Sequence, residues 1–244
     1  MTEEKTNQNE KPAELVQPKD QLVITKHKVT CGGHEVSYTA TAGRMILKEE
    51  ITNAEGEKKD LYEGEKPRSE IFFTAYTRDD AADSSKRPVT FAFNGGPGSA
   101  SVWVHLGMLG PKRVKLQPDG SPLPPPAELI ENEYSILDLT DLVFIDPVGT
   151  GFSRAVSGEK PKEFWGWKKD VESVGEFIRQ YITRNQRWNS PIFIAGESYG
   201  TTRTVGLADY LSDKHGLYLN GILLISTALD FSTLDFFPGN ELPY

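Results

Sequence analysis

The residues with the clearest chemical meaning are GESYG at positions 196–200, with Ser198 at their centre. A short apolar run at 192–195 precedes them, and apolar residues at helical spacing follow to position 211. A serine flanked by glycines, at a sharp turn from a strand into a helix, is typical of an enzymatic nucleophile. The alternative is an incidental serine in a turn of small residues. The strand-turn-helix context favours a nucleophile whose hydroxyl is exposed at the carboxyl end of its strand.

Two further motifs follow predicted strands in the same way. NGGPG at 94–98 comes directly after an apolar strand at 89–93, and its glycines leave backbone N–H groups uncovered, as an oxyanion hole requires. Alone, this motif would be an ordinary tight turn. The segment 146–153 follows an apolar run at 142–145 and is expected to form a rigid loop at the rim of a cleft. The alternative for this segment is a turn that only closes the strand.

The rest of the chain must supply the elements that position these motifs. Residues 22–30, 34–42 and 44–51 alternate apolar and polar types around Gly32-Gly33 and Gly43, which predicts an antiparallel meander. Next we expect a charged loop at 53–67, a strand at 70–77 and, at 110–126, an extended surface loop rich in proline.

The second half of the chain alternates predicted strands and helices. Apolar residues between 167 and 182 recur at helical spacing, and 222–225 is expected to be a buried strand. This order predicts an α/β fold with a mixed, mostly parallel sheet, helices on both faces, and the antiparallel meander at one edge. The carboxyl ends of the parallel strands should carry the site.

Composition and charge exclude several kinds of partner and structure. The 244 residues carry a formal net charge of −8, which argues against nucleic acid as a partner, and no apolar run is long enough to span a bilayer. Residues 1–20 are polar and without periodicity, which predicts a disordered leader. Because no secretory signal is present, a cytoplasmic location is expected for this form, or an extracytoplasmic one if the N-terminus was processed. The single cysteine, Cys31, excludes an internal disulfide.

Three segments together make the chain resemble a known family. FNGGPGSASVW at 93–103, LVFIDPVGTGFSRA at 142–155 and FIAGESYGTT at 193–202 are similar to motifs of the serine carboxypeptidases, which have the α/β-hydrolase fold. The resemblance covers residues 89–229. It implies that this chain acts on peptides with a free C-terminus through an acyl-enzyme, and that it uses no metal and no cofactor.

The resemblance also implies roles for five residues. Ser198 becomes the nucleophile, and the amides of Gly96 and Tyr199 become the oxyanion hole. Asn94 and Glu197 become the groups that bind the carboxylate of the substrate, with Glu197 protonated at acid pH.

The chain departs from the family pattern at two positions. Ala92 stands where the family usually has tryptophan. Met108 stands where the family has a glutamate that is hydrogen-bonded to the glutamate just before the nucleophilic serine, here Glu197. A methionine cannot share a proton with Glu197, so a free C-terminus should be recognised more weakly or differently. Acyl transfer at Ser198 needs neither group, so an esterase or acyltransferase function is an alternative.

The partners of the nucleophile are not evident in this chain. In this superfamily the acid and then the histidine follow the serine, and only His215, expected as a solvated histidine at a helix end, lies beyond Ser198. Asp230 is expected to cap a strand end or a turn. None of the remaining histidines fits the role of base: His27, His34 and His105.

The resemblance implies that the acid and the histidine lie beyond Tyr244, together with a lid and further strands. Residues 21–244 are predicted to form the N-terminal part of one α/β-hydrolase domain, inactive by itself. A non-catalytic binding half that needs a partner chain is the alternative. The oligomeric state is not predicted.

Overall fold

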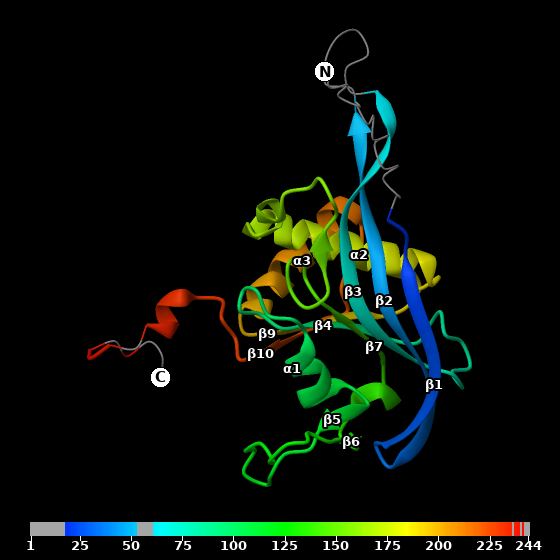
Figure 1. Ribbon diagram of the computed structural model, residues 1–244, viewed down its shortest axis with the longest axis vertical. Helices are drawn as coiled ribbons and strands as arrows, with labels where there is room; N and C mark the ends of the chain where they lie inside the picture. Colours follow the sequence, from blue (N-terminus) through cyan, green and yellow to red (C-terminus); the bar gives the residue numbers. More distant parts are fainter. Residues whose placement is uncertain (1–17, 53–60, 236, 240, 242–244) are drawn as a thin grey trace, which may run out of the picture.

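The computed structural model describes residues 18–52, 61–235, 237–239 and 241. The predicted leader, apart from residues 18–20, lies outside the described residues, and so do residues 53–60 of the predicted charged loop. The centre of the structure is an eight-stranded mixed sheet with the order β1-β2-β3-β7-β4-β9-β10, to which the short strand β8 (Arg154–Ala155) is added beside β3 (Figure 1).

The first three strands form the antiparallel side of the sheet. They are β1 (Gln21–Cys31), β2 (His34–Thr52) and β3 (Tyr62–Arg78), and the β1–β2 turn falls at Gly32-Gly33 as predicted. Two predictions are wrong here. The charged loop ends before Tyr62 instead of at Pro67, and β2 continues through Gly43 without a turn. A Cβ at Gly43 would lie 1.9 Å from the carbonyl oxygen of Gln21, so glycine is needed there for close approach of β1.

The three motifs lie together at the carboxyl ends of the parallel strands. These strands are β4 (Val89–Phe93), β7 (Asp141–Ile145), β9 (Ile192–Glu197) and β10 (Gly221–Ile225), and β4 lies between β7 and β9. In the β4–β9 ladder, Phe93 pairs with Gly196. The NGGPG and GESYG segments therefore leave the sheet side by side.

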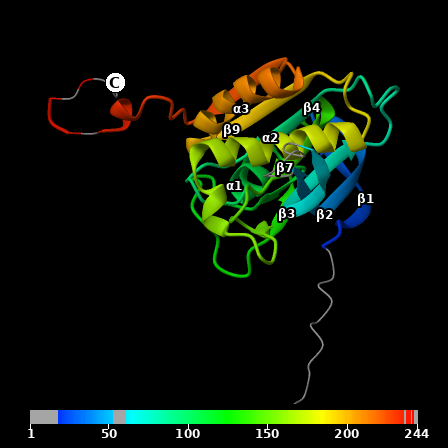
Figure 2. The ribbon, with the colours of Figure 1, turned by 90° about the horizontal axis from the view of Figure 1, so that it is seen from above.

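Helices cover both faces of the sheet, as predicted. α2 (Trp167–Arg184) and α3 (Tyr199–His215) lie on one face, and α1 (Val102–Val104) continues into η1 (His105–Leu109) on the other (Figures 1 and 2). Strand β7 is apolar on both of its faces. Val143 and Ile145 join the core under α2 and α3, and Leu142 and Phe144 join the core under α1 and η1.

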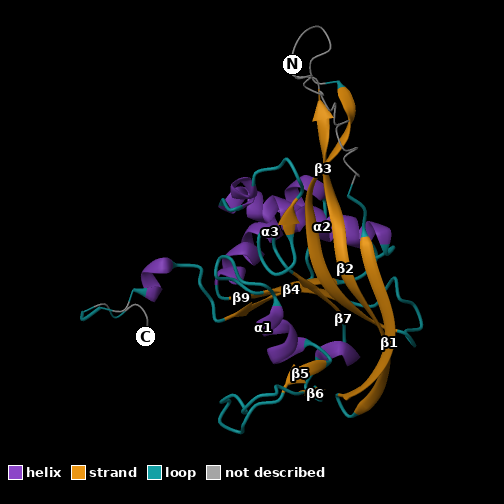
Figure 3. Cartoon of the chain, viewed as in Figure 1, coloured by secondary structure: helices purple, strands orange, loops and turns teal. Residues whose placement is uncertain are grey.

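The remaining segments are short. The predicted loop at 110–126 contains the short strand β5 (Lys112–Val114), which pairs with β6 (Leu129–Glu131) beyond the loop as a separate two-stranded sheet, visible in Figure 3. Three single turns of helix complete the described elements: η2 (Ile136–Asp138), η3 (Pro161–Phe164) and η4 (Phe231–Leu234). Among the described residues, no helix combines the length and the apolar character needed to cross a bilayer.

Strand β10 is less buried than predicted. It is the last strand of the sheet and pairs only with β9, so its outer edge has no neighbouring strand among the described residues. The side chains of Ile222 and Leu223 are accordingly 42% and 38% exposed. The prediction of a fully buried strand is wrong, because an apolar run does not reveal whether a strand has one neighbour or two.

Candidate active site

Ser198 lies in a strained turn between β9 and α3, as predicted. Its backbone has φ 55° and ψ −124°, a conformation that costs a non-glycine residue about 1–3 kcal/mol. Three contacts hold it there. The Ser198 amide donates to the carbonyl oxygen of Ile225 at 2.9 Å, and the Ser198 carbonyl accepts from the amide and the hydroxyl of Thr201 at 2.8 and 2.7 Å. The neighbouring strand β10 thus helps to fix the turn.

The glycines around the turn are needed for close packing. A Cβ at Gly196 would lie 2.1 Å from the carbonyl oxygen of Gly200, inside the turn itself. A Cβ at Gly95 would lie 2.4 Å from the amide nitrogen of Tyr199. Residues 94–98 after β4 are predicted to contribute to an oxyanion hole, and we call them the oxyanion loop. This segment packs directly on the turn that carries Ser198.

The two residues predicted to bind a carboxylate are in contact. Asn94 Nδ2 donates to Glu197 Oε2 at 2.9 Å, and Asn94 Oδ1 accepts from the amide of Val104 at 3.0 Å. Asn94 is buried and Glu197 is half-buried. Because the Val104 amide can only donate, it fixes the orientation of the Asn94 amide, which turns its NH₂ group toward Glu197.

A pocket of about 450 Å³ opens beside Ser198. Its lining combines the nucleophile and polar groups with an apolar wall, in which Trp103 and Met108 are 70% and 44% exposed. The described residues that line it are Asn94, Gly96, Ser99, Trp103, Val104, Met108, Glu197, Ser198, Ile225 and Ser226. Its volume lies within the range usual for small-ligand sites.

Four of the five predicted site residues therefore meet in one pocket. The fifth, Tyr199, is not part of the lining, but as the first residue of α3 it has an N–H that no carbonyl within the helix can accept. Of the two departures from the family pattern, Met108 reaches the pocket and Ala92 does not, since Ala92 is buried in the core under α1 and η1.

Sequence reasoning missed a buried ion pair behind the turn. Arg203 Nε donates to both carboxylate oxygens of Asp170, at 3.1 and 2.9 Å, and Nη1 donates to the carbonyl oxygen of Asn94 at 2.9 Å. Its guanidinium also lies over the rings of Phe93 and Tyr199, 5.0 and 5.2 Å from their centroids. The available signal was helical spacing, which places Arg203 on the same face of α3 as the buried Leu207.

The loop at 146–153 bonds to Ser101, which follows the oxyanion loop, and does not line the pocket. Asp146 Oδ1 accepts from the amide of Ser101 at 2.8 Å, and burial raises the pKa of this carboxyl group. Ser153 Oγ donates to the carbonyl oxygen of Asp146 at 2.6 Å and accepts from the amide of Phe72 at 2.8 Å. These hydrogen bonds tie the loop to its neighbours, but none of its residues lines the pocket, so its predicted place at the rim of the cleft stays a prediction.

None of the four histidines, all of which the structure describes, lines the pocket. His27 and His34 belong to β1 and β2, and His215 ends α3, about 25 Å from the start of this 17-residue helix. His215 was expected to be solvated, which is wrong, because it is mostly buried and its Nε2 lies 2.8 Å from Glu176 Oε1. Asp230 caps η4, accepting from the amide of Ser232, in agreement with the predicted turn role.

His105 lies in η1, on the face of the sheet opposite α2 and α3. Its Nε2 lies 2.6 Å from the Tyr76 hydroxyl oxygen and its ring stacks on Phe144, with 4.4 Å between centroids. Burial lowers the pKa of His105 to about 4. At ordinary pH it is therefore a neutral structural residue.

This pKa predicts how stability depends on pH. Below about pH 6.5 the unfolded chain protonates His105 while the folded chain does not, so the free energy of unfolding should fall between about pH 6.5 and 4. The loss is at most about 3 kcal/mol. Urea unfolding at several pH values should show this loss in the wild type and a smaller loss in His105→Gln. Parallel pH profiles of the two proteins would contradict the assignment.

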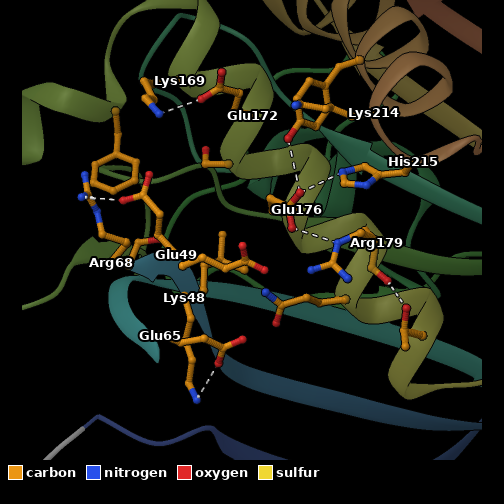
Figure 4. A pocket seen from close by; sticks show the side chains of 18 of the residues that line it. Lys48, Glu49, Glu65, Arg68, Lys169, Glu172, Glu176, Arg179, Lys214 and His215 are labelled. Carbon is orange, nitrogen blue, oxygen red and sulfur yellow. Dashed lines mark hydrogen bonds and ion pairs between the residues drawn. The ribbon is translucent and has the colours of Figure 1, made fainter. Parts of the chain in front are cut away.

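A larger pocket lies elsewhere and does not contain Ser198. It has a volume of about 890 Å³ and lies between α2, the end of α3 and strands β2 and β3 (Figure 4). Several of its charged side chains bond to one another: Arg68 with Glu49 at 2.7 Å, Lys169 with Glu172 at 2.8 Å, and Arg179 with Glu176 at 2.9 Å. These paired groups already have ionic partners, so this pocket carries no assignment as a ligand site.

Comparison with known proteins points in the same direction as the geometry. The family model described as serine carboxypeptidase matches residues 58–232, more than half of the chain. Serine carboxypeptidase-like 51 of Arabidopsis thaliana is 26% identical over 182 residues, which are 70% of this chain and 37% of that protein. The pheromone-processing carboxypeptidase KEX1 of Saccharomyces cerevisiae is 32% identical over 137 residues, which are 53% of this chain and 18% of that protein.

A solved structure extends the likeness to three dimensions. The crystal structure of KEX1(delta)p, a prohormone-processing carboxypeptidase from S. cerevisiae, matches with a TM-score of 0.51 and 27% identity, over 78% of this chain and 40% of that one. The chain thus spans less than half the length of these relatives. Its mixed sheet, with the nucleophile turn between a central parallel strand and a helix, has the α/β-hydrolase fold that the motifs imply. The chain belongs to the serine carboxypeptidase family.

Proposed function

We propose that these residues form the nucleophile-bearing part of a serine-type carboxypeptidase, which removes the C-terminal residue of a peptide through an acyl-enzyme on Ser198. The observation that carries this proposal is the meeting of Ser198, Gly96 and the bonded pair Asn94–Glu197 in one pocket of about 450 Å³. A nucleophile beside groups that can bind a carboxylate suits a bond close to the end of a peptide.

Each residue has a chemical task in this proposal. The hydroxyl oxygen of Ser198 attacks the carbonyl carbon of the last peptide bond, and the developing oxyanion accepts from the amides of Gly96 and Tyr199. Each such donor lowers the barrier by about 2.7–4 kcal/mol. Asn94 and Glu197, the latter in its protonated form at acid pH, bind the terminal carboxylate, and Trp103 and Met108 provide apolar surface for the departing residue.

The general base is assigned to polypeptide outside these 244 residues. A serine hydroxyl is a weak nucleophile unless an adjacent base takes its proton. Because no histidine of this chain lines the pocket, the proposal needs a histidine from elsewhere, and the exposed outer edge of β10 is the place where further strands could join.

A second candidate is an esterase or acyltransferase that uses the same nucleophile. Met108 favours it, because this apolar side chain lines the pocket where the family pattern has a carboxyl group. In that case the pocket would hold an apolar group of an ester in place of a peptide end.

The two candidates differ in their need for a free carboxylate. We expect the complete enzyme to cleave a peptide with a free C-terminus and to leave the same peptide, amidated at its C-terminus, almost intact. The measurement is the rate of release of the last residue from each peptide, with a matched ester as a third substrate. If the amidated peptide is cleaved equally well, the carboxypeptidase assignment fails, and a preference for the ester would favour the second candidate.

A further inference from the structure

Two buried arginines hold the two ends of the central strand β4. At its amino end, Arg187 Nη1 donates to Asp141 Oδ2 at 2.6 Å and Nη2 donates to the carbonyl oxygen of Arg87, also at 2.6 Å. At its carboxyl end, Arg203 bonds to Asp170 and to the carbonyl oxygen of Asn94. Arg187 and Arg203 are 3% and 1% exposed. A charged side chain that is buried to this extent is stable only when its ion-pair and hydrogen-bond partners stay in place.

The contacts of Arg203 join three elements at the site. Asp170 lies in the first turn of α2, Arg203 lies in α3 behind Ser198, and Asn94 is the residue before Gly95 and Gly96. A guanidinium is planar, and its N–H groups point in fixed directions. Asp170 therefore sets the plane of the guanidinium, and that plane determines where the Asn94 carbonyl lies.

We propose that Arg203, oriented by Asp170, is a positioning residue that holds the oxyanion loop in register with Ser198. If the Asn94 carbonyl moved, the backbone of Gly95 and Gly96 and the Asn94 side chain would move with it. The inference rests on the proposed function, because it assigns to Arg203 the placing of an oxyanion donor. Arg203 touches neither the pocket nor the reacting atoms, and it acts through Asn94.

The kinetic test uses the complete enzyme and an ester that has no terminal carboxylate. Arg203→Met removes the charge and the donors, and we expect kcat to fall by about 10²-fold with KM little changed, since a misplacement of about 1 Å can cost that much. Arg187→Met is the matched control, because it removes an equally buried arginine paired with an aspartate at the far end of β4. With rates corrected for the folded fraction, Arg187→Met should keep its kcat.

Arg203→Lys is a second variant, which keeps the test valid if Arg203→Met does not fold. Lysine keeps the charge but cannot span Asp170 and Asn94 with a fixed fork of donors. We expect it to restore the melting temperature more fully than kcat. Equal kcat in the Arg203 variants and in Arg187→Met would overturn the inference.

A second measurement does not depend on catalysis. The Ser99 amide donates to the Gly95 carbonyl oxygen and the Val104 amide donates to Asn94 Oδ1, so both report on the oxyanion loop, whereas the Val89 amide reports on the amino end of β4. In the complete enzyme, hydrogen exchange at Ser99 and Val104 should quicken in Arg203→Met and Arg203→Lys, and exchange at Val89 should quicken in Arg187→Met. If the wild type hydrolyses nothing, the proposed function fails and this measurement still tests Arg203. Unchanged exchange at Ser99 and Val104 refutes the positioning role.

Discussion

Ser198→Ala is expected to lower the turnover of the complete enzyme by about 10⁶-fold, the cost of removing the serine from a catalytic triad. The reason is the geometry of the turn, which places Ser198 in the pocket beside Gly96 and the bonded pair Asn94–Glu197. Folding should change little, since alanine and serine meet the same strain at a φ of 55°. Peptide turnover and covalent labelling by a fluorophosphonate are the two measurements.

Ser99→Ala is the matched control for this experiment. Ser99 is another serine that lines the same pocket, and it follows the oxyanion loop instead of the nucleophile turn. We expect Ser99→Ala to keep its labelling and Ser198→Ala to lose it. Labelling that survives in Ser198→Ala would remove Ser198 as the nucleophile.

The 244 residues alone are expected to be catalytically silent. Loss of the base from a serine triad costs about 10⁶-fold in turnover, and the pocket of this chain has no histidine in its lining. The proposed oxyanion donors and the proposed carboxylate-binding pair are part of this chain, so we expect it to bind a peptide end even though it does not hydrolyse the peptide. The measurement compares peptide and ester turnover of this chain with that of a protein extended beyond Tyr244.

The same comparison of the two proteins should show that the outer edge of β10 is exposed in the 244-residue chain. Because Ile222 and Leu223 are 42% and 38% exposed there, this chain should bind a hydrophobic dye and aggregate, and the longer protein should do so less. Equal turnover in the two proteins would refute the need for an external base. The base would then have to be one of the four histidines, which His→Asn variants at 27, 34, 105 and 215 would identify.

Local patterns of the sequence predicted where the motifs of the candidate site lie, and the family resemblance supplied the roles of their residues. A strand, a glycine-flanked serine and a helix can be recognised within about twenty residues, because a sharp turn and the spacing of apolar residues are local properties. The order of the elements then implied a parallel sheet, and the carboxyl ends of parallel strands lie at one edge. Asn94 and Ser198 could therefore be assigned to one site although they are far apart in the sequence.

Only the tertiary structure decided which residues support that site. Gly43 resembles a turn residue, and its true reason, the close approach of β1, belongs to another strand. The apolar residues of β10 were expected to be buried, but burial depends on neighbours that an apolar run does not specify. Arg203 is the clearest case. A charge inside a protein is stable only when its partners surround it, and those partners, Asp170 and the Asn94 carbonyl, come from elements that meet only in the folded chain.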